Sequence, residues 1–304
     1  MAKMKSTKVR EPLGDRILHA FTTLFMLFIL VIVGYPLIYC ISSSFSSADA
    51  LSNGEVILWP VDFSLAGYNF ILKYDQVWVG FRNTIFYTIV ATMIQIVSQI
   101  LVAYPLSKRN YQARGFCTKC MVVAMLVSAG MIPSFLLMVK LGFYNTVWPL
   151  LIGGAVTISN VMILRTSFKS SIPEDLFDAA KIDGAGDFRQ LTTIAVPLAK
   201  ATISVIMLYA AVAQWNSYFT ALLYLGTDSE HLWPLQLVVR NIMQIASDLD
   251  TSDMGADAIA ALSKSNIEQV RYGLIVVVTT PLLVMYLVAQ RFFEKGVMIG
   301  SVKG

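Results

Sequence analysis

Charged side chains are scarce in this chain. Only 14% of its 304 residues are Asp, Glu, Lys or Arg, and 56% are hydrophobic, whereas an ordinary soluble domain carries about 25% charged residues. A water-soluble fold has no interior large enough for so much apolar surface. The composition therefore excludes an ordinary soluble domain and indicates a membrane protein.

Histidine and cysteine are also rare, which limits metal chemistry. The chain has two histidines, His19 and His231, and three cysteines, Cys40, Cys117 and Cys120. The last two cysteines form a C-x-x-C pair, but one such pair without further ligands nearby is a weak metal signal. The sequence has no H-E-x-x-H motif either. We expect no metal site and no intramembrane hydrolase.

Two features that would couple transport to an energy source are missing. No G-x-x-x-x-G-K-[ST] loop is present to cradle nucleotide phosphates, so ATP has to be handled by another chain. No apolar run holds a paired set of charged side chains, which ion-coupled carriers commonly place inside the membrane. The sequence predicts a transport subunit that is not an enzyme; the alternative is a secondary, ion-coupled transporter.

Long apolar runs are what the sequence does have. Six of them reach the roughly 20 residues that a helix needs to cross about 30 Å of hydrocarbon. We therefore predict an all-α membrane protein in which residues 1–304 form a single transmembrane domain. The expected spans are 17–41, 83–107, 118–139, 147–165, 198–225 and 272–291.

The charges between the spans alternate in sign and predict the topology. Basic residues collect at both chain ends and in the turn after the second span, whereas the loops between spans one and two and between spans five and six are acidic. Lys and Arg in short loops favour the cytoplasmic side. We expect both termini in the cytoplasm and those two loops outside.

The segment Pro173 to Pro197 is charged and lies between two apolar runs on the predicted inner side. Pro173 suits a helix start, and the acids Glu174 and Asp175 match the positive end of the helix dipole. Glycine is the usual residue past a helix end, so Gly184 marks the stop. Leu176, Ala179 and Ala180 recur at helical spacing. A helix over about 173–184 is marginal alone, so its small and aromatic face should rest on a neighbour.

The run "DAAKIDGAGDFRQLTTIAVP", Asp178 to Pro197, resembles the E-A-A-x-x-D-G-A signature of permease subunits of binding-protein-dependent ABC importers. Asp178 stands for Glu and Val196 for Leu, both mild departures. The stretches "YPLIYCISSSFSS", "GFRNTIFYT", "QWNSYFTALLYL" and "QRFFEKGVMIGSVKG" are similar to the carbohydrate-importing branch. The nearest resemblance is to maltose-type second permease subunits, in the subgroup for polysaccharide-derived oligosaccharides.

This resemblance implies a type I ABC importer permease fold whose short cytoplasmic helix is a coupling helix held in a cleft of the ATPase. The carboxyl tail of such subunits reaches into the ATPase dimer. The implied ATPase-coupling residues are Glu174, Asp175, Leu176, Phe177, Asp178, Ala179, Ala180, Asp183, Gly184, Ala185 and Pro197, and the implied tail residues are Gly300, Ser301, Val302, Lys303 and Gly304.

The resemblance also implies partners and a location. The expected partners are a second homologous permease, two ATP-binding subunits that hold ATP and Mg, an extracellular sugar-binding protein and the lipid bilayer, with no nucleic acid. This chain itself would bind no cofactor. The expected location is the bacterial cytoplasmic membrane, crossed several times.

A sugar pathway needs neutral hydrogen-bonding groups and flat aromatic surfaces, because sugars offer hydroxyls and apolar C–H faces. Two spans carry such side chains, and buried amides need partners. The same residues could instead join one helix to another, and Gln95 and Gln99 could contact the partner permease. The candidate pathway residues are Tyr87, Thr92, Gln95, Gln99, Gln214, Trp215, Asn216 and Tyr218.

Overall fold

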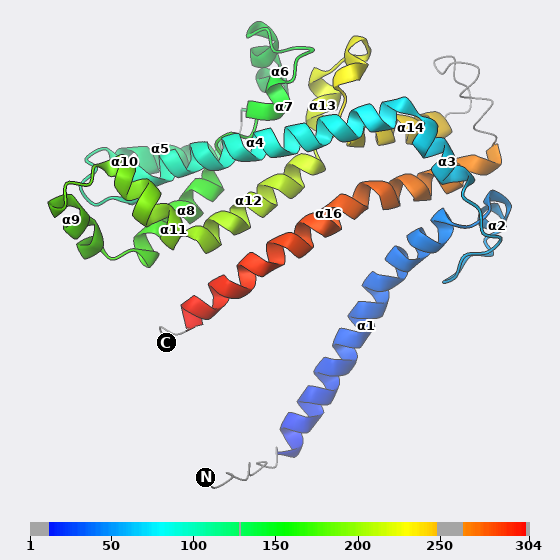
Figure 1. Cartoon of the computed structure of the whole chain (residues 1–304), viewed down its shortest axis with the longest axis horizontal. Coiled ribbons are helices and arrows are strands. Elements are labelled where there is room, and N and C mark those ends of the chain that lie inside the picture. The colour runs from blue at the N-terminus through cyan, green and yellow to red at the C-terminus, as the bar shows by residue number, and fades with distance from the viewer. Residues whose placement is uncertain (1–11, 128, 248–263, 302–304) are drawn as a thin grey trace. The chain divides into compact units, whose positions relative to one another are not determined.

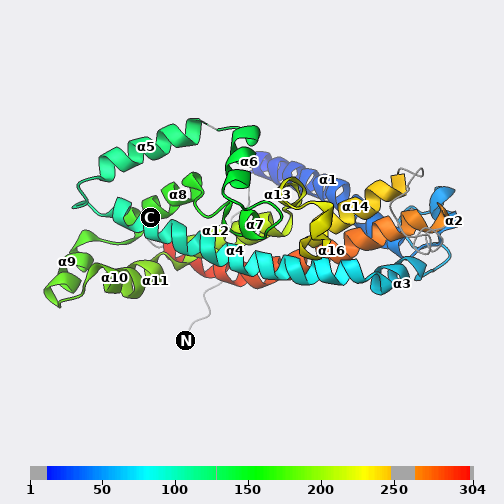
Figure 2. The ribbon, with the colours of Figure 1, turned by 90° about the horizontal axis from the view of Figure 1, so that it is seen from above.

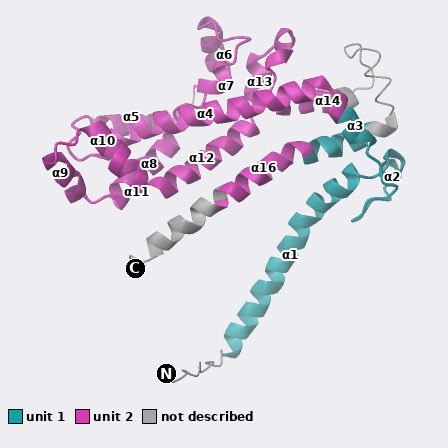
Figure 3. Cartoon of the chain, viewed as in Figure 1, with its two compact units in different colours: residues 1–71, 253–276 teal, residues 72–252, 277–304 magenta. Residues whose placement is uncertain are grey.

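The computed structural model describes residues 12–127, 129–247 and 264–301, and in these ranges every regular element is a helix (Figure 1). The all-helical prediction is confirmed. The chain divides into two compact units, residues 1–71 with 253–276 and residues 72–252 with 277–304 (Figure 3). We describe each unit by itself.

The first unit contains α1 (Leu13–Ser44), α2 (Ala48–Ser52), most of α3 (Ala66–Lys73) and the start of α16 (Lys264–Ser301). The first twenty residues of α1 expose apolar side chains all round, and only Ser42, Ser43 and Ser44 are buried. The Gln269 side chain is fully buried; its Nε2 donates to Ser64 O at 2.7 Å and its Oε1 accepts from Gly67 N. These bonds tie α16 to the start of α3.

The second unit is organised around α4 (Asp75–Ser107), which packs against α7 (Trp148–Ile152), α8 (Ile158–Ser171), α12 (Lys200–Trp215) and α14 (Leu235–Ser247) (Figures 1 and 2). Its main core joins the C-terminal half of α4 to α8 and α12 through Tyr104, Leu164, Phe168 and Ile206. α4 therefore contacts many of the other helices of this unit.

Shorter helices complete the second unit. They are α5 (Arg114–Leu126), α6 (Met131–Lys140), α9 (Glu174–Ile182), α10 (Asp187–Gln190), the π-helix η1 (Leu191–Ala195), α11 (Val196–Leu198), α13 (Phe219–Tyr224) and the 3₁₀-helix η2 (Thr227–Leu232).

Within the described ranges, three helices are long and apolar enough to cross a membrane: Leu13–Ser44, Asp75–Ser107 and Ile267–Val288. Two bent pairs, α5 with α6 at 113° and residues 187–198 with α12 at 82°, raise the number to five if each pair is one span. The expected span 147–165 consists of α7 and part of α8, separated at residues 153–157. The six-span arrangement stays a prediction.

The connection into the fifth expected span is not one continuous helix. Pro197 lacks a backbone donor, and the turns before it form η1, in which Val196 N–H bonds to Leu191 O. The chain then bends at Ala199, whose φ and ψ are −92° and 11°. The expected span 198–225 is also interrupted after Trp215, before α13 begins at Phe219.

The Phe168 side chain tests whether the core between α4 and α8 holds the second unit together. Phe168 is 1% exposed and its ring lies 6.2 Å from that of Tyr104, at right angles. We expect Phe168→Ala to lower the free energy of unfolding by about 3–5 kcal/mol, measured by thermal unfolding in lipid nanodiscs. Phe116→Ala, at a side chain 72% exposed, is the matched control; equal losses would contradict this core assignment.

Candidate functional site

The short helix α9 begins and ends as its sequence dictates. Pro173 precedes the helix with φ −58° and ψ 140°, and Glu174 and Asp175 occupy the first turn. At the other end Gly184 has a φ of +76°. Gly184 N–H bonds to Lys181 O, and Ala185 N–H bonds to Ala180 O. This is a Schellman motif, which needs a residue with positive φ and therefore favours glycine.

Part of the small and aromatic face of α9 lies against α4. Phe177 and Ala180 are partly buried, whereas Leu176 and Ala179 are exposed and Ile182 is 87% exposed. The Phe177 ring packs against the core and lies 6.3 Å from the ring of Tyr104 on α4.

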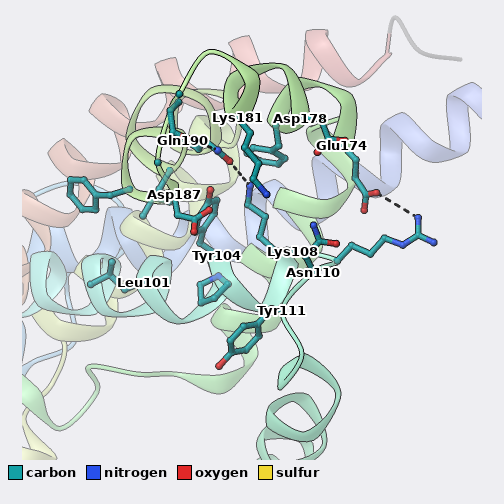
Figure 4. Close-up of a pocket in the computed structure, with 18 residues that line it drawn as sticks. Leu101, Tyr104, Lys108, Asn110, Tyr111, Glu174, Asp178, Lys181, Asp187 and Gln190 are labelled. Atoms are coloured by element: carbon teal, nitrogen blue, oxygen red, sulfur yellow. Dashed lines mark hydrogen bonds and ion pairs between the residues drawn. The ribbon is translucent and has the colours of Figure 1, made fainter.

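Lys108, the residue that follows α4, joins α4 to both α9 and α10 (Figure 4). Its Nζ lies 3.1 Å from the ring centroid of Phe177 and 4.9 Å from that of Tyr104. The same Nζ donates to Gln190 Oε1 at 3.0 Å. A cation over aromatic faces is attracted by the ring quadrupoles, more strongly when it is partly desolvated. Sequence reasoning used Lys108 only as a topology signal and missed this role.

Gln190 and Arg109 add two further ties around Lys108. Gln190 is 4% exposed, and its Nε2 donates to Ala185 O at 2.8 Å, just past the end of α9. Arg109 forms an ion pair with Glu174 at 3.6 Å, but both side chains are exposed, and such surface pairs contribute about 0–1 kcal/mol. The buried Gln190 amide therefore holds the C-terminal end of α9, whereas the exposed Arg109–Glu174 pair adds little at the first residue of the helix.

A cavity of about 780 Å³ lies between the C-terminal end of α4 and the segment α9–α10 (Figure 4). Tyr104, Lys108, Glu174, Asp178 and Asp187 are among its lining residues. The Tyr104 hydroxyl is buried and has no hydrogen-bond partner in the described part of the chain. Charges of both signs line this space, so it favours no ion of one sign.

Burial and the neighbouring charged groups shift the pKa of the Lys108 side chain. Burial lowers the pKa of the Lys108 ammonium below its ordinary value of 10.5; the carboxylates of Asp187 and Asp178 act in the opposite direction, and the Lys181 ammonium adds to the lowering. Because the unfolded chain holds this proton up to a higher pH, the contribution of Lys108 to stability rises with pH between its folded pKa and 10.5.

The candidate pathway residues of α4 point into the second unit rather than into open space. Tyr87 is 3% exposed and donates its hydroxyl proton to Leu232 O at 2.9 Å. Thr92 and Gln99 are buried, and no described group pairs with Thr92 Oγ1 or with either amide atom of Gln99. Gln95 lies against Gly154, whose added Cβ would be 3.2 Å from Gln95 Nε2.

The other candidate pathway residues divide into two kinds. Gln214 donates to Leu150 O at 3.2 Å, and the buried Trp215 donates to Val278 O at 3.1 Å, so both join helices to each other. Asn216 and Tyr218 are exposed. Asn216 Oδ1 accepts from Gln236 Nε2, and the ring of Tyr218 lies beside that of Phe219. The structure does not bring the eight candidates into one cavity.

Two further predictions concern the carboxyl tail and metals. Gly300 and Ser301 lie in the last turn of α16, while Val302, Lys303 and Gly304 lie outside the described residues. A search of the described residues for three or more His, Cys, Asp or Glu side chains that could hold a metal finds none.

Long apolar helices joined to a short, capped helix with a glycine stop fit a membrane subunit of the ABC-importer permease class. Comparison with known proteins gives the family. No family model matches the chain. It is 34% identical over 298 residues to the polygalacturonan/rhamnogalacturonan transport system permease protein YtcP of Bacillus subtilis, covering 97% of this chain and 100% of that protein. It is also 34% identical to Protein LplC of the same organism, covering 88% and 89%.

A solved structure agrees with these relatives. The chain matches a bacterial ABC transporter involved in importing the acidic polysaccharide alginate, with a TM-score of 0.85, 31% identity, and coverage of 94% of this chain and 100% of that one. The chain therefore belongs to the permease subunits of carbohydrate ABC importers, as predicted. Subunits of this family have no ATPase activity and bind no cofactor themselves. The alternative of an ion-coupled carrier is set aside.

The electrostatic environment of Lys108 can be tested by titration. Attraction to Asp187 opposes the effect of burial, so we expect Asp187→Asn to lower the pKa of Lys108 further. The measurement is the pH dependence of the dimethyl-lysine ¹³C signal of Lys108, assigned by its loss in Lys108→Arg. Asp183→Asn is the control, because Asp183 does not act on Lys108. A lower pKa in the control but not in Asp187→Asn would contradict the geometry.

Proposed function

We propose that this chain is one half of the translocation pathway of an ATP-driven oligosaccharide importer, and that α9 is the coupling helix that a separate ATPase subunit grips. The geometry of α9 is the observation that supports it. One side chain of this helix, Phe177, anchors it to α4 through Lys108, while the opposite face is exposed.

The exposed face of α9 and α10 has the composition of a docking surface. Ile182 is 87% exposed, Phe188 74% and Leu176 42%. Exposed apolar groups beside charged ones mark interaction sites, and Asp175 and Asp183 are exposed in the same segment. Unlike α1, which is apolar along its length, this segment mixes apolar and charged groups and so suits a protein surface rather than lipid. An ATPase cleft fits that chemistry.

The proposed topology has six spans and both termini in the cytoplasm. Three long helices and two bent pairs account for five spans, and α7 with α8 supplies the sixth as a broken helix. The basic turn 108–119 and the acidic loop 49–75 support this orientation. The proposed location is the cytoplasmic membrane of a bacterium.

A cysteine-labelling experiment tests this topology. In a variant without the native cysteines, Asn53→Cys and Gln112→Cys lie at exposed positions of the acidic loop and the basic turn. We expect a membrane-impermeant maleimide to label Asn53→Cys in right-side-out vesicles and Gln112→Cys only in inside-out vesicles. The reversed pattern would contradict the orientation.

The proposed assembly contains a second homologous permease, two ATP-binding subunits that hold ATP and Mg, and an extracellular sugar-binding protein. Of the candidate pathway residues, Asn216 and Tyr218 are exposed and could contact a sugar. The buried ones are better placed to shape the helices around the pathway. Oligosaccharides released from acidic polysaccharides are the first substrates to test, because YtcP and the alginate importer are named for such polymers.

Gly184 provides the direct test of coupling. Val at position 184 would strain the positive φ by about 1–2 kcal/mol and distort the end of α9. We expect Gly184→Val to leave the assembled complex intact while oligosaccharide uptake falls at least about tenfold per ATP hydrolysed, in proteoliposomes. Gly186 has a φ of −67° and open space around it, so Gly186→Ala should keep uptake coupled. Full coupling in Gly184→Val would contradict the proposal.

A further inference from the structure

The outer end of α4 holds the junction at which the 3₁₀-helix η2 ends and α14 begins. Consecutive backbone carbonyls of residues 230 to 233 accept hydrogen bonds from α4 side chains: Glu230 O from Gln76 Nε2 at 2.7 Å, His231 O and Trp233 O from Asn83 Nδ2 at 2.8 and 3.1 Å, and Leu232 O from Tyr87 Oη at 2.9 Å. Leu235 N–H donates to Thr84 Oγ1 at 2.7 Å. We name residues 230–235 the outer segment.

The α4 residues that make these bonds form one face of the helix, because they recur at helical spacing. Gly80 lies on the same face, and a Cβ there would be 3.1 Å from Leu235 Cα. The backbone of the outer segment therefore lies directly on α4. Asn83, Thr84 and Tyr87 are at most 8% exposed, so these bonds are shielded from water and breaking them leaves buried groups unpaired.

The opposite end of α4 is attached to α9 and α10 just as specifically. Lys108 contacts Phe177 and Gln190, and Tyr104 packs against Phe177 and Phe168. Arg165 on α8 donates to Leu106 O at 3.0 Å and so pairs a carbonyl of the last turn. Between the two ends the helix has 33 residues, about 50 Å at 1.5 Å per residue. Its one proline, Pro105, lies in the final turn.

We propose that α4 is a connecting rod, which makes the coupling helix and the outer segment move as one piece. A displacement of α9 is transmitted through Lys108 and Gln190 to α4, and from α4 to residues 230–235. In the proposed function these residues lie next to the surface where a sugar-binding protein would dock. The side chains Asn83, Thr84 and Tyr87 are then positioning residues for transport. This inference rests on the proposed function, which makes α9 the ATPase-facing helix.

Two threonines on adjacent turns of α4 give a matched pair for the test. Thr84 and Thr88 are 2% and 5% exposed. Thr84 Oγ1 binds the outer segment, whereas Thr88 Oγ1 has no hydrogen-bond partner among the described residues. Thr→Val keeps the shape of each side chain. Only Thr84→Val removes a tie to the outer segment, and adding Asn83→Leu removes two more.

The experiment is hydrogen–deuterium exchange on the whole complex, purified through a tag on this chain, in nanodiscs with and without ATP, Mg and vanadate. We expect nucleotide to change exchange in residues 174–185 in every variant. In the outer segment of the wild type and of Thr88→Val, nucleotide should change the exchange rate by about fivefold or more. A fivefold change corresponds to the free energy of about one net hydrogen bond. The change should shrink in Thr84→Val and vanish in the double variant.

The outcomes separate the two claims. If residues 174–185 respond to nucleotide but the outer segment of the wild type does not, the connecting rod is wrong and the coupling helix stands. An equal outer response in Thr84→Val, the double variant and Thr88→Val would also overturn the rod. If residues 174–185 do not respond, the proposed function fails as well.

A distance measurement keeps the test independent of whether these variants assemble. Arg189 and Asp228 are exposed and lie beyond the two ends of α4. Spin labels at Arg189→Cys and Asp228→Cys should keep one distance with and without nucleotide, because the rod moves both together. A shift of more than about one helical turn, about 5 Å, would overturn the inference.

Discussion

The contact of Lys108 with Phe177 and Gln190 is the interaction on which the candidate site depends. α9 has nine residues, and a helix of that length is marginal in water without tertiary contacts. Most of its side chains are exposed, so it is held by one aromatic ring, one ammonium and a backbone cap. Because the tie is small and specific, α9 can present its remaining surface to another protein and still be fixed to α4.

The helix α4 connects this small contact to the rest of the second unit. Its C-terminal end carries aromatic and cationic groups that bind α9 and α10, its middle packs against α8 and α12, and its N-terminal end carries amide and hydroxyl groups that bind backbone carbonyls. The side chains of each part of α4 therefore match the groups that they contact. In the proposed function such a continuous element is needed, because the ATPase would act at one membrane face and the sugar-binding protein at the other.

Local features of this chain could be predicted from sequence, and long-range ones could not. Pro173 and Gly184 marked the ends of α9 because caps depend on adjacent residues. The length of α9 and its aromatic residue predicted that the helix needs a neighbour, but no local pattern shows that Phe177 rests on Tyr104 of α4. Lys108 reaches Gln190 across more than eighty residues, which no local pattern reports. Trp215 was assigned to the sugar pathway because its chemistry fits, yet its indole N–H bonds to a backbone carbonyl of α16.

The most direct test of this account is a photo-crosslink from the exposed tip of α9. A benzoylphenylalanine at Ile182, whose side chain is 87% exposed, should crosslink to a soluble ATP-binding subunit in intact membranes, identified by mass spectrometry. The yield should change when ATP and vanadate are added. A crosslink to an extracytoplasmic sugar-binding protein, or none to any nucleotide-binding subunit in the assembled complex, would contradict the account.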